Sequence, residues 1–154
     1  MAHASSAMRR LALATAAALW VANVAAAEPR TWDQAAVTAL AGELVERVKA
    51  LRSAHRQTPP PQVGSGDSRA HLALTDGLRL IRNESRHLKR ELEQGKGREE
   101  TLPVAKRLRS LIDSARVDAR KLRLTSPLLD EIQATNAALA QLWEYYGLAA
   151  DPGT

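Results

Sequence analysis

A hydrophobic repeat between residues 71 and 92 constrains the fold of this chain more than any other feature. Core-type positions recur there at alternating intervals of three and four residues, which is the spacing of a stripe along one face of an α-helix. The positions are His71, Leu74, Leu78, Ile81, Ser85, Leu88 and Leu92. A long helix with one apolar face buries that face against partners, so the pattern predicts a helical bundle or a coiled coil.

Three further amphipathic stretches accompany this repeat, and breakers separate all four. The first stretch begins at Thr31 as a capping residue and ends before the prolines of 59–61, which lack the amide proton that a helix needs. The third has Thr101 as its candidate cap and follows two glycines, and the fourth begins with Ser126 as its cap. Their predicted core positions are Val37, Leu40, Leu44, Val48 and Leu51; Val104, Leu108, Leu111, Ala115 and Leu122; and Leu129, Ile132, Asn136, Leu139, Trp143 and Tyr146.

The fold class that these patterns predict is all-α. No segment shows the alternating pattern of a strand, and four helices joined by short links favour an up-down-up-down antiparallel four-helix bundle over residues 28–154. Trp32, Trp143 and Tyr146 are then expected in one aromatic layer, because the first and last helices have that end in common. A pair of long coiled-coil hairpins that dimerise is the alternative. The chain is therefore expected to be a monomer or a homodimer.

The first 27 residues have the organisation of a secretory signal peptide. Arg9 and Arg10 precede an apolar run over 11–24, and 25–27 are three alanines, which suit signal-peptidase cleavage after Ala27. The alternative is an uncleaved membrane anchor, but alanine dominates the run and makes it weakly hydrophobic. We therefore expect a periplasmic or secreted protein with no transmembrane span after processing.

The charge balance changes once the leader is removed. The full chain has a formal net charge of +5, and the loss of Arg9 and Arg10 lowers it to +3. The exported chain is therefore only mildly basic. Together with export, this weak excess argues against a nucleic-acid partner.

Several catalytic and cofactor chemistries lack their residues in this chain. There is no Cys, which excludes disulfide scaffolds, thiolate zinc sites, iron–sulfur clusters and cysteine nucleophiles. The motifs G-x-S-x-G and H-E-x-x-H and a glycine-rich phosphate loop are absent too. Glu84 and His87 match the E-x-x-H spacing of di-iron bundles, but those bundles need two such motifs. We expect no catalytic residues, no enzyme activity and no cofactor.

The predicted architecture resembles the exported four-helix-bundle cytochromes of the non-covalent b type and of the c-prime type. The likeness is one of helix number, helix length and export, and it implies a haem site in the core. The ligands of those families have no counterpart here: C-x-x-C-H is absent, no Met follows residue 27, and 126–146 contains no His. The resemblance is therefore one of shape, which says little about function.

Two histidines remain as candidate ligands for a metal or another small molecule. The turn between the first two helices is centred near residue 62, so antiparallel packing places His55 opposite His71. Neutral imidazoles bind haem iron and zinc, although zinc takes three or four ligands. The pair supports an alternative function as a periplasmic small-molecule, haem or metal-binding bundle. The other interpretation is an amphipathic cap on the end of the core.

Two polar residues interrupt the predicted core stripes. Ser85 and Asn136 occupy core positions of the second and fourth helices, where an unpaired polar group costs about 1–3 kcal/mol. Each is therefore expected to hold a hydrogen bond. They either fix the register of the helices, as a single core Asn does in coiled coils, or line a ligand cavity.

Basic residues gather on the second and third helices, and the fourth has none. These two helices are neighbours in the predicted bundle, so their arginines are expected to form one basic face, with Arg79, Arg82, Arg86, Arg116 and Arg120 as its binding residues. A solvated face with local ion pairs is the other interpretation. The sequence thus predicts an exported, non-catalytic bundle that binds an anionic protein or envelope surface.

Overall fold

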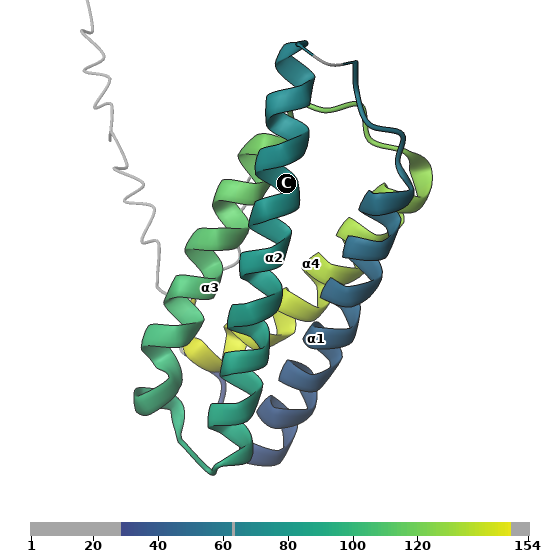
Figure 1. The fold of residues 1–154 in the computed structure, drawn as a ribbon. Coiled ribbons are helices and arrows are strands. Elements are labelled where there is room, and N and C mark those ends of the chain that lie inside the picture. Colours follow the sequence, from purple (N-terminus) through teal and green to yellow (C-terminus); the bar gives the residue numbers. More distant parts are fainter. Residues whose placement is uncertain (1–28, 63, 149–154) are drawn as a thin grey trace, which may run out of the picture.

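The computed structural model describes residues 29–62 and 64–148, which form four antiparallel helices (Figure 1). These are α1 (Gln34–Gln57), α2 (Gly66–Glu93), α3 (Arg98–Ala119) and α4 (Ser126–Tyr146). The all-α prediction and the antiparallel four-helix arrangement are confirmed. The predicted signal peptide lies outside the described residues. No helix in the described part is both long and apolar enough to cross a membrane.

The N-cap of α1 lies two residues after the predicted cap, and the N-cap of α4 lies one residue before the predicted cap. Asp33, not Thr31, caps α1, because its side chain accepts a hydrogen bond of 3.0 Å from the N–H of Ala36. Thr125 occupies the N-cap of α4, and Ser126 is already helical. A Ser–Pro pair suits any position in a first helical turn, where amide protons have no intrahelical partner. Sequence pattern alone therefore left the starting residue undetermined.

The predicted cap of α3 is wrong, and the difference places a polar residue in the core. The N-cap is Gly97, whose N–H donates to the side chain of Glu100 at 2.9 Å. Thr101 therefore lies inside the helix and is buried. Its hydroxyl shares a hydrogen bond of 2.8 Å with the hydroxyl of Tyr146, so it ties the start of α3 to the end of α4.

The core follows the predicted stripes closely on α2 and less closely on α4. Every predicted α2 position from Leu74 to Leu92 is buried, and Ser85 donates a hydrogen bond of 2.8 Å to the carbonyl of Ile81. On α4 the predicted Leu129 is 42% exposed, whereas Leu128 is 1% exposed. The first half of α4 is therefore rotated relative to the prediction. The second half is not, since its predicted positions from Leu139 onward are buried.

Packing between the helices is uneven. α1 packs along both α2 and α4, and α2 packs along α3. The α1–α4 contact closes the bundle within one chain. α3 and α4 touch over much less of their length, so the interface between them is the most open side of the bundle.

Aromatic rings and backbone hydrogen bonds close the end of the bundle away from the prolines. The ring of Trp32 lies 5.4 Å from that of Tyr146 and 6.5 Å from that of Tyr145, both edge to face. The N–H of Arg30 donates to the carbonyl of Glu144 at 2.8 Å. Of the predicted layer of Trp32, Trp143 and Tyr146, the contact between Trp32 and Tyr146 is present, and Trp143 is buried in the core. Both ends of the described chain meet here.

Candidate functional site

Four arginines from two helices gather on one side of the bundle, and we call them the arginine cluster. Burial lowers the pKa of Arg52, and three neighbouring guanidinium groups lower it further by charge repulsion. The cluster consists of Arg52 and Arg56 from α1 and Arg79 and Arg82 from α2. The groups repel one another, so the folded chain concentrates positive charge between α1 and α2.

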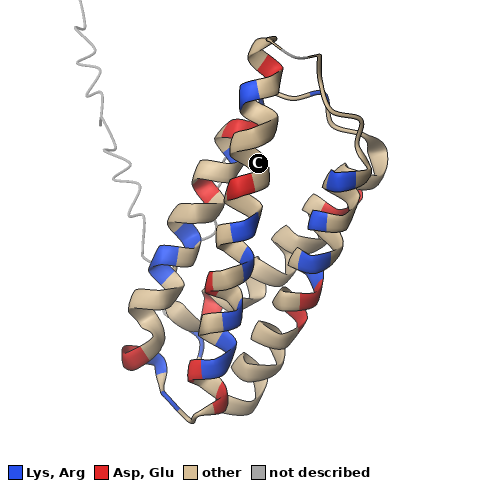
Figure 2. Cartoon of the chain, in the orientation of Figure 1, with Lys and Arg blue, Asp and Glu red and all other residues tan. Residues whose placement is uncertain are grey.

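Acidic residues do little to neutralise this cluster. Asp76 lies 3.5 Å from Arg79, and no ion pair reaches Arg52 or Arg82 from the described residues. The flank of α2 that faces α3 differs: Glu84 lies 3.4 Å from Arg107 of α3, and Glu91 pairs with a lysine. Figure 2 shows basic positions on the later half of α1 and along α2. Among the arginines of the cluster, only Arg79 therefore has an ion pair with a described acidic residue.

The structure divides the five predicted binding residues between two sides of the bundle. Arg79 and Arg82 belong to the arginine cluster, and Arg86 follows one turn later on the same stripe of α2. Arg116 instead lies between α3 and α4, where it donates to Asp113 at 3.2 Å and to Asn136 at 3.0 Å. Arg120 follows at the end of α3 and is exposed.

Sequence analysis missed the contribution of α1 to this charge. Arg52 and Arg56 are four residues apart and each directly follows a core residue, Leu51 and His55. That spacing places both arginines on one flank of α1. The signal was present, but it becomes informative only once α2 is known to lie on that flank.

The two predicted histidines lie together at the proline end of the bundle. Their ring centroids are 4.5 Å apart, and His55 is only 3% exposed. The Thr75 hydroxyl donates to the carbonyl of His71 at 2.9 Å and lies 2.9 Å from Nε2 of His55. Because that hydroxyl proton is already donated, Nε2–H of His55 is the donor to Thr75. Nδ1 of His55 is buried and has no hydrogen-bond partner among the described residues.

A cavity of about 220 Å³ adjoins the histidine pair and has a mixed polar and apolar wall. Asp67 and Arg123 contribute charge, and Leu122 and Leu128 contribute apolar surface. Within residues 29–62 and 64–148, no three His, Asp or Glu side chains are grouped as a metal site requires. Two imidazoles alone make a weak metal site.

The pH dependence of stability follows from His55. Burial lowers its pKa below the ordinary value of 6.5, and positive charge on His71 lowers it further. As the pH falls through 6.5, the unfolded chain therefore binds a proton at this histidine that the folded chain does not bind. The contribution of His55 to the free energy of unfolding is complete above pH 6.5 and is lost as the pH drops below that value. We expect the melting temperature of the wild type to decrease between pH 7.5 and pH 5.5 in thermal scans, over the range where this residue titrates.

The matched variant for this prediction is His55→Leu, which keeps an apolar group in the buried position. Its melting temperature should change less over the same pH range, because Leu does not titrate. His71 and His87 are present in both proteins, so the difference between the two curves reports the titration of His55 together with its coupling to His71. Parallel curves would contradict the assignment of the pH dependence to His55.

Comparison with known proteins does not assign this chain to a family. It matches no family model, no curated protein and no solved structure.

Proposed function

We propose that the chain is an exported, non-catalytic binding protein, and that its arginine cluster docks an anionic partner. The observation that supports this proposal is the concentration of four guanidinium groups between α1 and α2 with little acidic compensation. An anion that approached this side would relieve the repulsion among the arginines. The free energy of that relief adds to binding.

The residue type also supports an anionic partner. Arginine presents a planar fork of N–H groups that matches a carboxylate or a phosphate in two parallel hydrogen bonds. Arg52 and Arg56 come from one helix and Arg79 and Arg82 from its neighbour, so the anionic groups of a partner can be held from two sides. A phosphate-bearing envelope surface and a carboxylate-rich protein surface both have this chemistry.

Vesicle co-sedimentation tests the proposal with defined anions. The wild type is expected to bind vesicles that contain phosphatidylglycerol and not vesicles of phosphatidylcholine alone, with weaker binding at higher salt. The test variant is Arg52→Gln, Arg56→Gln, Arg79→Gln, Arg82→Gln. It should bind roughly two to three orders of magnitude more weakly, since each basic residue near an anionic surface contributes about 1 kcal/mol. Immobilised poly-glutamate, tested in parallel, represents an acidic protein partner.

The control variant removes the same number of positive charges from α3 and its C-terminal end. It is Lys106→Gln, Arg107→Gln, Arg120→Gln, Lys121→Gln, and it should keep most of the binding. If both variants lose binding equally, net charge alone is responsible and the arginine cluster is not a specific site. If the wild type binds neither the anionic vesicles nor poly-glutamate, the proposed function is wrong.

A carrier of a small molecule, haem or metal is the second candidate function, and the cavity of about 220 Å³ that has both histidines in its wall favours it. An absorbance spectrum and metal analysis of protein purified from the export compartment test this candidate. It predicts a stoichiometric cofactor that is lost in His55→Ala and in His71→Ala. Protein without such a cofactor would contradict the haem and metal forms of this function.

A further inference from the structure

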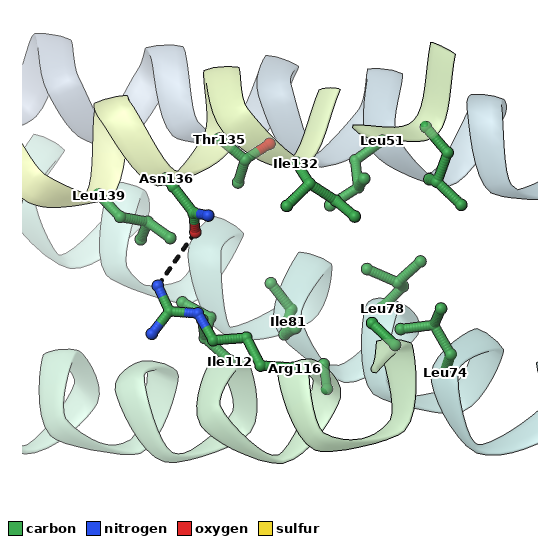
Figure 3. A pocket seen from close by; sticks show the side chains of 13 residues that line it. Leu51, Leu74, Leu78, Ile81, Ile112, Arg116, Ile132, Thr135, Asn136 and Leu139 are labelled. Atoms are coloured by element: carbon green, nitrogen blue, oxygen red, sulfur yellow. Dashed lines mark hydrogen bonds between the residues drawn. The ribbon is translucent and has the colours of Figure 1, made fainter. Parts of the chain in front are cut away.

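A second cavity lies inside the bundle where α3 and α4 diverge. Its volume is about 70 Å³, and its wall is formed mostly by apolar side chains from all four helices. Figure 3 shows Leu74, Leu78 and Ile132 around it, with Arg116 and Asn136 meeting at one edge. Water needs two or more polar partners to occupy such a space. The apolar part of the cavity offers none, so it suits a hydrocarbon group.

The guanidinium group at this edge has one hydrogen-bond position that is not used. Nε–H and Nη2–H of an arginine point in the same direction and together bind the two oxygens of a carboxylate. In Arg116, Nη2 donates to Oδ1 of Asn136 at 3.0 Å, whereas Nε is buried and has no partner among the described residues. Of these two adjacent donors, only Nη2–H is therefore bonded, and its acceptor is a neutral amide oxygen.

The local charge at the edge favours an anion. Asp113 lies 3.2 Å from Arg116 and 4.0 Å from Arg109. The two guanidinium groups of Arg109 and Arg116 therefore share the single carboxylate of Asp113, and the net charge of these three side chains is positive. Arg116 is 26% exposed, so a ligand head group at this position would be partly shielded from water and would remain accessible.

α3 and α4 lie on either side of this edge, and of the four pairs of neighbouring helices they pack least closely. The hydrogen bond between Arg116 and Asn136 joins them here, and the one between Thr101 and Tyr146 joins them at the far end. Rotation of the Asn136 side chain would open the edge without breaking a backbone hydrogen bond. A narrow chain could then enter between α3 and α4.

We propose that this cavity binds a straight-chain monocarboxylate of about the length of octanoate. Its carboxylate would take both N–H groups of Arg116 in place of the Asn136 oxygen, and its hydrocarbon tail would enter the apolar cavity. The volume admits about five to seven water-sized groups at roughly 10–15 Å³ each. On α4 the wall runs from Leu128 to Leu139, about 16 Å along the helix axis. These dimensions suit an extended alkyl tail better than a ring.

Isothermal titration calorimetry with octanoate tests this inference on the purified protein. We expect saturable binding of one octanoate per chain, with a negative heat-capacity change because apolar surface is buried. Acetate should not bind measurably, since it has the head group without the tail. Arg116→Gln should weaken octanoate binding about tenfold to a hundredfold, the effect of losing hydrogen bonds to a charged group.

Arg107→Gln is the matched control, because Arg107 also lies on α3 but pairs with Glu84 of α2 and does not line the cavity. It should bind octanoate within about twofold of the wild type. Ala119→Leu adds a side chain to the cavity wall and should block binding while the melting temperature holds or rises. The variant without the arginine cluster should bind octanoate normally, which separates this site from the proposed function. Absence of saturable binding, equal losses in Arg116→Gln and Arg107→Gln, or normal binding by Ala119→Leu would each overturn the inference.

Discussion

Replacing Trp143 with alanine is expected to lower the free energy of unfolding by about 3–5 kcal/mol. Trp143 is only 5% exposed and belongs to the core that α4 shares with the rest of the bundle. Truncation removes its ring from that core and leaves a void that neighbours fill only in part. Urea or guanidinium unfolding at equilibrium, followed by circular dichroism, measures the loss.

Two further variants make this result interpretable. Trp143→Phe keeps an aromatic ring in place and should lose clearly less stability than the alanine variant. Val117→Ala, at a position that is 53% exposed, should change stability by less than about 0.5 kcal/mol. A loss below about 1 kcal/mol in Trp143→Ala would mean that this side chain is not a core residue.

Adjacent leucines at the start of α4 should respond very differently to the same substitution. Leu128→Ala is expected to cost about 2–5 kcal/mol, because Leu128 is fully enclosed and lies between the two cavities. Leu129→Ala should cost less than about 1 kcal/mol, because that side chain is substantially exposed. Each variant is the control for the other, since both remove the same atoms from the same helical turn.

Chemical unfolding of the two variants also tests the rotation of α4. The sequence stripe predicted Leu129 as the core residue, and the structure places Leu128 there. If Leu129→Ala proved the more destabilising variant, the original stripe would be correct and the start of α4 would be turned the other way. The Leu128 result also bears on the cavities, because a smaller side chain there would join their walls.

Breakers and periodicity made the number and order of the helices predictable. The prolines of 59–61 and the glycines near 95 separate the helices by local chemistry, and the α2 repeat has a single apolar face. The start of α4 was not determined in this way. Leu128 and Leu129 are equivalent in any local scale, so packing against the neighbouring helices decides which one is buried.

The histidine pair and the arginine cluster show two different degrees of predictability. His55 and His71 could be brought together from sequence, because the proline turn fixes which heights of α1 and α2 coincide. The cluster could not, because it depends on how each helix is rotated about its own axis. Arg116 shows the same limit: it lies on the flank of α3 that faces α4, away from Arg79 and Arg82.

The hydrogen bond from Arg30 to Glu144 brings both ends of the described chain to one end of the bundle. Arg56 lies about 33 Å from the start of α1 at Gln34, at a rise of 1.5 Å per residue. An affinity tag or fluorophore joined directly before Pro29 or directly after Leu148 would therefore attach far from the histidine pair and from Arg56. Immobilised through such a tag, the molecules would share one orientation on a sensor chip, with the proline end directed into solution.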